Sequence, residues 1–384
     1  MKLLFSLTYY RPHMSGLTIY VQNLAEALVR RGHEVTVLTS QHDPALPSQE
    51  TLNGVNIIRI PAQFWISKGA IMLGYPLVAM PLLRAHDVVA INLPNTFVET
   101  LTLCLTARLI ARRPIAAIYH CDVRLPPGFF NRIVDMVVFS VNMIAGVFAD
   151  RMIAYTEDFA HRSHVLRRFL SKTEVIPPPV PALVSNPADV EEFRREHAPN
   201  NELLIGFSGR IATEKGIEYL LEALPYIHKV MPNTKALFAG DHKNVIGEED
   251  YWQFLQPLLE PLHDCCTFIG RLDPKQLAAY YSACDVTVLP SINNTETFGL
   301  VQVESMLCGT PVVASDLPGV RVPIQTTGMG KLVPPRDAVS LANAIIEVLD
   351  HRQEYIRPRE VVEQCFSLSV TTQQYEMLFE HLLN

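Results

Sequence analysis

Three common signatures are missing from this 384-residue chain. Its seven cysteines are scattered without Cys-x-x-Cys spacing, so neither a disulfide framework nor a zinc site is indicated. No Gly-x-Gly-x-x-Gly follows the first expected strand, which argues against a dinucleotide-dependent oxidoreductase. Every apolar run looks too short or too interrupted to span a bilayer, since even residues 64–83 contain Lys68, Pro76 and Pro81. We therefore expect a cytoplasmic protein.

Charge is unevenly divided along the chain. Residues 1–180 hold 17 Lys and Arg against 12 Asp and Glu, a balance of +5, whereas the remainder holds 15 against 27, a balance of −12. Together these give the net charge of −7. The asymmetry indicates either that the first half meets an anionic partner such as phospholipid, or that two domains simply differ. No nucleic-acid partner is expected.

Strands and helices alternate in both halves, which predicts α/β domains with parallel, doubly wound sheets. In the first half, strands are expected at Leu3–Leu7, Glu34–Thr39, Val55–Ile60, Val88–Ile91, Ile115–Tyr119 and Met152–Tyr155. In the second half, they are expected at Leu203–Ser208, Lys235–Ala239, Thr267–Ile269, Asp285–Leu289 and Pro311–Ala314. Ile176-Pro-Pro-Pro-Val-Pro181 breaks the pattern, because consecutive prolines fit neither a helix nor a central strand. The expected domains are therefore 1–180 and 181–367, followed by an amphipathic helix at 368–384.

The most informative stretch is Glu296-Thr-Phe-Gly-Leu-Val-Gln-Val-Glu304, which follows the strand expected at 285–289. Glu296 is expected in a loop at the carboxyl end of that strand, and Glu304 about two turns into the next helix. Ligands of open parallel sheets bind at this edge, and a helix N-terminus there suits a phosphate. The spacing alone also fits a surface glutamate followed by a capping one.

This motif, behind Val288-Leu-Pro-Ser291 and before Gly309-Thr-Pro-Val-Val-Ala-Ser315, resembles the donor site of glycosyltransferase family 4. That resemblance implies a retaining enzyme of the glycosyltransferase B (GT-B) fold, with two Rossmann-like domains facing across a cleft. Domain 1–180 would bind the acceptor and domain 181–367 the nucleotide sugar, with the last helix returning to the first domain. Glu296 would bind sugar hydroxyls, and Glu304 the nucleotide ribose.

The resemblance assigns further residues to catalysis. Gly209-Arg210-Ile-Ala-Thr-Glu-Lys215-Gly216 follows an expected strand, and Arg210 and Lys215 would bind the diphosphate and stabilise its leaving charge. His120 ends another strand and would assist beside the transferred sugar. From residue type alone, solvated loop charges and a structural histidine are the alternatives.

Glycine-containing turns complete the expected donor site. The family shows two glycines in the first loop, whereas this chain has Ser15-Gly16, which leaves Gly16 as the phosphate candidate. The further donor-binding candidates are Gly240, Arg271, Leu272, Phe298, Gly299 and Leu300. Arg271 and Leu272 would meet the nucleobase, and the last three would meet the distal phosphate. For each turn, a glycine required only by the backbone is the alternative.

No Asp-x-Asp occurs in the chain, so the site is expected to work without a metal, and no cofactor is expected besides the co-substrate. The resulting prediction is a hexosyltransferase that moves a sugar from a UDP- or GDP-linked donor to a lipid or saccharide acceptor. A non-catalytic nucleotide-sugar-binding protein is the alternative.

Residues 124–151 are unusually apolar and are flanked by arginines on both sides. Apolar surface beside basic side chains is typical of a helix lying on a membrane. Asp135 and Asp150 argue against a spanning helix. The segment therefore predicts peripheral contact with an anionic membrane, or else a buried helix packed on the sheet.

Overall fold

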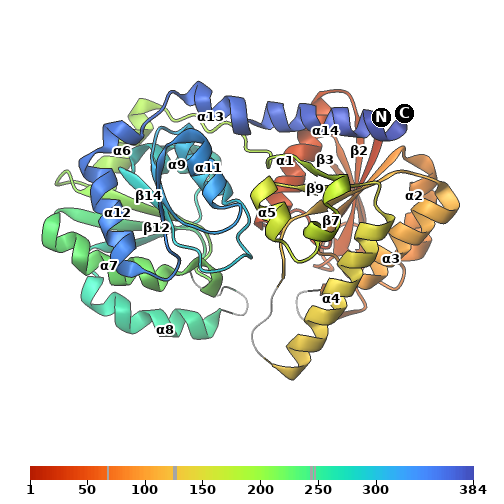
Figure 1. Cartoon of the computed structure of the whole chain (residues 1–384), viewed down its shortest axis with the longest axis horizontal. Helices are drawn as coiled ribbons and strands as arrows, with labels where there is room; N and C mark the ends of the chain where they lie inside the picture. The colour runs from red at the N-terminus through yellow and green to blue at the C-terminus, as the bar shows by residue number, and fades with distance from the viewer. Residues whose placement is uncertain (67–68, 124–127, 243–244, 246–247) are drawn as a thin grey trace. The chain divides into compact units, whose positions relative to one another are not determined.

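The computed structural model describes residues 1–66, 69–123, 128–242, 245 and 248–384, and it divides into two compact units (Figure 1). Unit 1 comprises Met1–Pro179 and Leu368–Asn384, and unit 2 comprises Val180–Ser367. The division falls inside the proline-rich stretch expected to link two domains. The last helix belongs to unit 1, which is therefore discontinuous in sequence. Lys68 and residues 124–127, which entered the sequence-based expectations, lie outside the described residues.

Unit 1 is built on an eight-stranded sheet in the order β10-β9-β8-β7-β1-β2-β4-β3. Its strands are β1 (Lys2–Ser6), β2 (Glu34–Gln41), β3 (Gln49–Leu52), β4 (Val55–Pro61), β7 (Val88–Leu93), β8 (Ile115–Tyr119), β9 (Arg151–Ala154) and β10 (Thr173–Val175). All neighbours pair in parallel except β3, which runs antiparallel to β4. A separate hairpin pairs β5 (Phe64–Ile66) with β6 (Gly69–Ile71). The prediction of a parallel α/β sheet is confirmed, but the strands β3, β5, β6 and β10 were not predicted.

Helices cover both faces of this sheet, as the strands' continuous apolar runs require. One face packs against α1 (Gly16–Arg30) and α14 (Leu368–Leu383), where Phe5 meets Phe379 at 6.3 Å between ring centroids. The other packs against α2 (Tyr75–Ala85), α3 (Phe97–Thr106) and α4 (Phe129–Phe148), which share one buried cluster with Leu4 and Ile91. The shorter helices are η1 (Ala107–Ala111), α5 (Glu157–Arg162), η2 (Leu166–Arg168) and η3 (Leu170–Lys172).

Unit 2 has a six-stranded sheet, ordered β13-β12-β11-β14-β15-β16, in which every neighbouring pair is parallel. The strands are β11 (Leu203–Ser208), β12 (Thr234–Ala239), β13 (Cys266–Gly270), β14 (Val286–Leu289), β15 (Val312–Ser315) and β16 (Gly330–Val333). Read from the first strand of the unit, this is the order of a dinucleotide-binding fold, and its connections reverse direction between β11 and β14.

The helices of unit 2 also form two layers, one on each face of the sheet. Helices α7 (Ile217–Val230), α8 (Glu249–Leu259) and α12 (Ala338–Asp350) share a buried cluster with Phe207 and Val286. Helices α6 (Pro187–His197) and α9 (Pro274–Ala283) share another with Leu204 and Leu237. The remaining helices are η4 (Thr213–Lys215), η5 (Glu260–Leu262), α10 (Leu300–Leu307), α11 (Arg321–Thr327), η6 (Arg352–Tyr355) and α13 (Arg359–Phe366).

Two expectations about helices are wrong. Glu304 is the fifth residue of α10, about one turn from its start rather than two. Helix α4 has 20 residues and a mean hydropathy of 1.4, so by length and composition it could cross a membrane, contrary to the expectation that no run could. Those properties alone are weak support for a span, since buried core helices share them.

Candidate active site

The carboxyl ends of β11 and β14 carry the charged residues that the motifs single out in unit 2. These strands are neighbours, and they flank the point where the strand order reverses. At such a point the two following loops diverge to opposite faces of the sheet and leave a crevice for a ligand. The β11 loop supplies Arg210 and Lys215, and the β14 loop supplies Glu296. The fold therefore brings the motifs together although they are far apart in sequence.

Lys215 and Glu296 form the central contact, in which Lys215 Nζ lies 2.5 Å from Glu296 Oε2. Both side chains are mostly buried, so water screens this ion pair less than a surface pair. The other carboxylate oxygen, Oε1, accepts the backbone N–H of Gly299 at 3.1 Å. Glu296 is thus fixed from two sides, and it holds the lysine cation at the edge of the sheet.

Arg210 is placed differently, because its side chain is exposed and, among the described residues, pairs within its own loop. Its Nη2 lies 3.2 Å from Glu214 Oε1. An exposed pair of this kind contributes little, about 0–1 kcal/mol, so an anionic ligand can displace Glu214 at small cost. Arg210 is therefore a cation available for a diphosphate.

Glu304 points to the side of α10 that faces α9. Its Oε2 accepts the Tyr281 hydroxyl at 2.9 Å. Burial raises the pKa of the Glu304 carboxyl, while the Tyr281 hydrogen bond lowers it in part. Sequence reasoning missed Tyr281. The only signal was a tyrosine pair, Tyr280-Tyr281, in an otherwise alanine-rich helix.

The glycine turns after β12 and β13 pack closely against each other and against the β11 loop. A Cβ on Gly240, which has φ +129°, would lie 2.2 Å from the carbonyl oxygen of Gly209. The close approach that requires this glycine is thus to protein backbone and needs no ligand. Arg271 forms a bidentate pair with Asp241, at 2.7 and 2.6 Å, which ties the two turns together. Leu272 packs at the margin of the α6–α9 cluster.

Residues 298–300 form the start of α10, as expected, but they are not equivalent. Gly299 is the N-cap in the left-handed region, with φ +75°. Phe298 is buried, and its ring lies 5.6 Å from that of Phe366. The Gly299 N–H donates to Glu296 Oε1. Leu300 is therefore the first residue of this helix whose N–H could bind a phosphate.

His120 belongs to unit 1, where it directly follows β8. The ring is buried, and both of its nitrogens are engaged: Nδ1 contacts the Tyr155 hydroxyl and Nε2 lies 2.9 Å from Asn92 Oδ1. Burial lowers the pKa of His120 to about 3. Because Asn92 Nδ2 donates to the Ser6 carbonyl, Oδ1 is left as an acceptor and Nε2 carries the proton. The imidazole is therefore neutral and held in one orientation.

The first loop of unit 1 has open space at its glycine. Ser15 is the N-cap of α1, and its Oγ accepts from the Thr18 N–H at 3.2 Å. Gly16 is the first helical residue, and a Cβ there would meet nothing within 4 Å. Ser15 thus supplies the cap where the family pattern has a second glycine.

A carboxylate that sequence reasoning missed lies beside this loop. Glu99, in α3, is fully buried, and Thr8 donates its hydroxyl to Glu99 Oε2 at 3.4 Å and to Asn95 Oδ1 at 2.7 Å. Burial raises the pKa of Glu99 to about 8. These groups follow β1 and β7, the pair between which the strand order of unit 1 reverses. An acidic residue inside an apolar helix was the available signal.

The described residues contain no cluster of three His, Cys, Asp or Glu side chains that could hold a metal. The candidate residues of unit 2, namely Arg210, Lys215, Gly240, Arg271, Leu272, Glu296, Phe298, Gly299, Leu300 and Glu304, all lie in the loops after β11–β14 or on α10. Gly16 and His120 lie at the corresponding edge of the unit 1 sheet.

Two units with parallel, doubly wound sheets and a charged site at a switch point fit the GT-B class of glycosyltransferases, and comparison with known proteins supports this class. The model of "Glycosyltransferase Family 4" matches residues 14–182, and that of "Glycosyl transferases group 1" matches residues 189–364. An uncharacterized glycosyltransferase of Methanocaldococcus jannaschii is 28% identical over 358 residues, covering 88% of this chain and 87% of the relative.

Solved structures show the same fold over the whole chain. The sucrose-phosphate synthase from Thermosynechococcus elongatus superposes with a TM-score of 0.80 at 25% identity, covering 99% of this chain and 98% of that one. Anabaena HepE in complex with UDP and glucose gives 0.78 at 22% identity and covers 99% of each chain. The chain belongs to the family 4, group 1 glycosyltransferases and has the GT-B fold. Both predictions from the sequence are confirmed.

Proposed function

We propose that this protein is a retaining, metal-independent hexosyltransferase that uses a UDP- or GDP-linked sugar. The observation that carries this proposal is the Lys215–Glu296 pair at the reversal point of the unit 2 sheet. A fixed cation there, with Arg210 beside it on the same loop, suits a diphosphate whose charge grows as it leaves. Anabaena HepE, of the same fold, is described with UDP, which favours a uridine nucleotide.

In the proposed reaction, the bond between the sugar C1 and the diphosphate oxygen breaks, and a bond from C1 to the acceptor oxygen forms on the same face. The acceptor proton passes to the departing phosphate oxygen. Arg210 and Lys215 stabilise that leaving group, and Glu296 binds sugar hydroxyls while it orients Lys215. His120 would assist beside the sugar as an uncharged ring, held in place by Tyr155 and Asn92, and not as a cation.

The nucleotide is proposed to contact the remaining donor residues. Glu304 would accept the ribose hydroxyls, oriented by Tyr281. The paired turns of Gly240 and Arg271, with Leu272, would meet the nucleobase side. Leu300 and Gly16 would supply backbone N–H groups to phosphate oxygens. The acceptor is proposed to be a lipid or a saccharide on the cytoplasmic side of a membrane, and no cofactor is needed.

Transfer activity tests this proposal. Purified protein would be screened against UDP- and GDP-sugars with lipid and saccharide acceptors, with and without EDTA, and the anomeric configuration of the product read by NMR. Activity should survive EDTA, and Lys215→Ala should lose on the order of 10²–10³-fold in turnover. Lys275→Ala, an exposed lysine of the same unit, is the matched control.

Several outcomes would overturn the proposal. Nucleotide-sugar binding without transfer to any acceptor would indicate a binding protein. Loss of activity in EDTA that magnesium restores would disprove metal independence. An inverted anomeric product would disprove retention.

A further inference from the structure

Helix α4 turns an apolar face to solvent over its first half. Only Val141, Asn142, Ala145 and Gly146 of this helix are buried. The exposed apolar residues include Phe129, 85% exposed, Phe130, 61%, and Met136, 60%. The alternative of a buried helix is therefore wrong for its first half. Exposed aromatic and aliphatic side chains in such number are unusual for a monomeric surface and indicate an interaction site.

The exposed residues of α4 form a continuous stripe. Phe129, Ile133, Met136, Ser140 and Val147 are exposed and lie at spacings of four, seven, eleven and eighteen residues from the first. At about 100° per residue, these positions point within roughly 40° of one direction. The buried residues lie on the opposite side. In most surface helices the apolar side faces the core, whereas the apolar stripe of α4 faces solvent.

The neighbouring helical segment adds to this surface. Helix α3 packs beside α4 (Figure 1) and continues directly into η1. Leu105, Leu109 and Ile110 of that segment are exposed. We refer to these residues and the α4 stripe together as the α3–α4 surface, because α3 packs against α4. This surface includes residues of α3, η1 and α4.

Basic side chains surround the α3–α4 surface. Segments 105–114, 128–150 and 165–172 together carry seven Lys and Arg but only two Asp, although the whole chain has a net charge of −7. The cations are Arg108, Arg112, Arg113, Arg132, Arg167, Arg168 and Lys172. The Arg168 guanidinium lies 5.3 Å from the centroid of the Phe139 ring of α4, so its charge sits directly on the helix. The local field favours an anionic partner.

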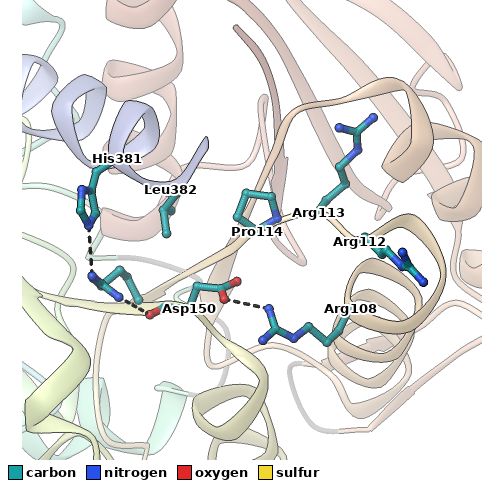
Figure 2. Close-up of a pocket in the computed structure, with 8 residues that line it drawn as sticks. Arg108, Arg112, Arg113, Pro114, Asp150, His381 and Leu382 are labelled. Atoms are coloured by element: carbon teal, nitrogen blue, oxygen red, sulfur yellow. Dashed lines mark hydrogen bonds and ion pairs between the residues drawn. The ribbon is translucent and has the colours of Figure 1, made fainter. Parts of the chain in front are cut away.

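A pocket of about 500 Å³ lies between η1 with the turn after it, the start of β9 and the end of α14, and it is lined by Arg108, Arg112, Arg113, Pro114, Asp150, Arg151, His381 and Leu382. Figure 2 shows Arg108 turned toward Asp150, with Arg112 and Arg113 also lining the pocket. Arg108 is paired with Asp150 at 2.8 Å, whereas Arg112 is exposed and has no carboxylate partner among the described residues. The pocket therefore keeps a cation in excess that could receive a phosphate.

We propose that the α3–α4 surface docks on a bilayer containing anionic phospholipid, with the apolar stripe in the interface and the arginines on headgroup phosphates. The helix lies on the bilayer and does not span it, because its second half is fixed to unit 1. A Cβ at Gly146 would lie 2.2 Å from the Phe169 ring, and Lys172 Nζ donates to the Ala149 carbonyl at 2.6 Å. The inference is independent of the proposed transfer reaction.

Vesicle flotation of the full chain tests this docking. The protein should float with equimolar phosphatidylglycerol and phosphatidylcholine, and binding should weaken as salt rises from ~50 to ~500 mM. Phe129→Gln with Phe130→Gln should reduce the partition coefficient roughly tenfold or more. Arg112→Ala and Arg132→Ala should each reduce it roughly fivefold. Circular dichroism would check that each variant is folded.

Matched substitutions in unit 2 serve as controls. Val184→Gln replaces an apolar residue that is 73% exposed, and Arg195→Ala removes an exposed arginine, so neither should change binding. Equal binding to pure phosphatidylcholine, or unchanged binding by the Phe129/Phe130 variant, would overturn the proposal. So would resistance to alkaline carbonate extraction, which indicates a span. Sedimentation showing a dimer that the same variant dissociates would assign the surface to a second copy instead.

Discussion

The two units share one architecture but treat charge at the edge of the sheet in opposite ways. Unit 2 holds Lys215 and Glu296 as an ion pair and leaves Arg210 exposed. Unit 1 buries His120 and Glu99 so deeply that the pKa of the histidine falls to about 3 and that of the carboxyl rises to about 8. Unit 2 therefore keeps charged groups at its sheet edge, whereas unit 1 keeps these two ionisable groups buried and neutral. The first arrangement suits the diphosphate of the proposed donor.

The largest expected effect separates the two glutamates of unit 2. Glu296→Gln should lower turnover on the order of 10²-fold or more, because the amide cannot hold Lys215 as an ion pair. Glu304→Ala should instead weaken binding of the free nucleotide diphosphate, on the order of tenfold. Calorimetric titration with UDP or GDP, alongside turnover assays, measures both. If Glu304→Ala binds the nucleotide as tightly as wild type, its ribose contact is disproved.

Replacing a glycine by alanine should cost more stability at Gly240 of unit 2 than at Gly16 of unit 1. Gly240→Ala should destabilise the protein by on the order of 2–3 kcal/mol, because its Cβ meets the Gly209 carbonyl and its φ is positive. Gly16→Ala should leave the stability nearly unchanged, since its Cβ meets nothing. Urea denaturation of both variants tests this. Equal midpoints would mean that the β11 and β12 turns can separate without cost.

Buried Glu99 should make the stability of unit 1 fall as pH rises from about 4.5 to about 8. Its pKa is raised from 4.5 to about 8 on folding, so the folded state binds a proton that the unfolded state has lost, and stability falls as pH rises through this window. From pH 6.5 to 8, wild type should lose about 2 kcal/mol relative to Glu99→Gln. Folded His120 does not titrate between pH 6.5 and 8, because its pKa is lowered to about 3, and the ordinary histidine pKa of 6.5 lies at the lower end of this range. A pH-independent difference in unfolding free energy would refute the neutral carboxyl.

The smallest effect is expected at Tyr281, which acts on the nucleotide only through Glu304. Tyr281→Phe removes one hydrogen bond to the Glu304 carboxyl and should weaken nucleotide binding about fivefold, less than Glu304→Ala. In the background of Glu304→Ala, the same substitution should have no further effect. An equal loss in both backgrounds would show that Tyr281 acts independently.

Much of the fold followed from periodic apolar runs. The strands at 115–119 and 203–208 were placed to the residue, because they are central, continuously apolar and bounded by polar turns. The short edge strands β3, β10 and β16 were missed, since their half-exposed residues carry no apolar pattern. The candidate residues came from the resemblance of their motifs to glycosyltransferase family 4, which gave no indication of their partners. Tyr281, Asn92 and Tyr155 have ordinary sequence surroundings and gain their roles only from contacts.

By itself, the sequence determined the two α/β units, the order of their motifs and the family, because local periodicity and motif spacing are properties of contiguous residues. Tertiary structure decided which groups are charged and which surfaces are free. Lys215 meets Glu296 across 81 positions of sequence, and His120 meets Tyr155 across 35. Whether α4 is a core helix or an exposed one likewise depended on what packs against it, since an apolar stripe has the same pattern whether it faces a sheet or a lipid surface.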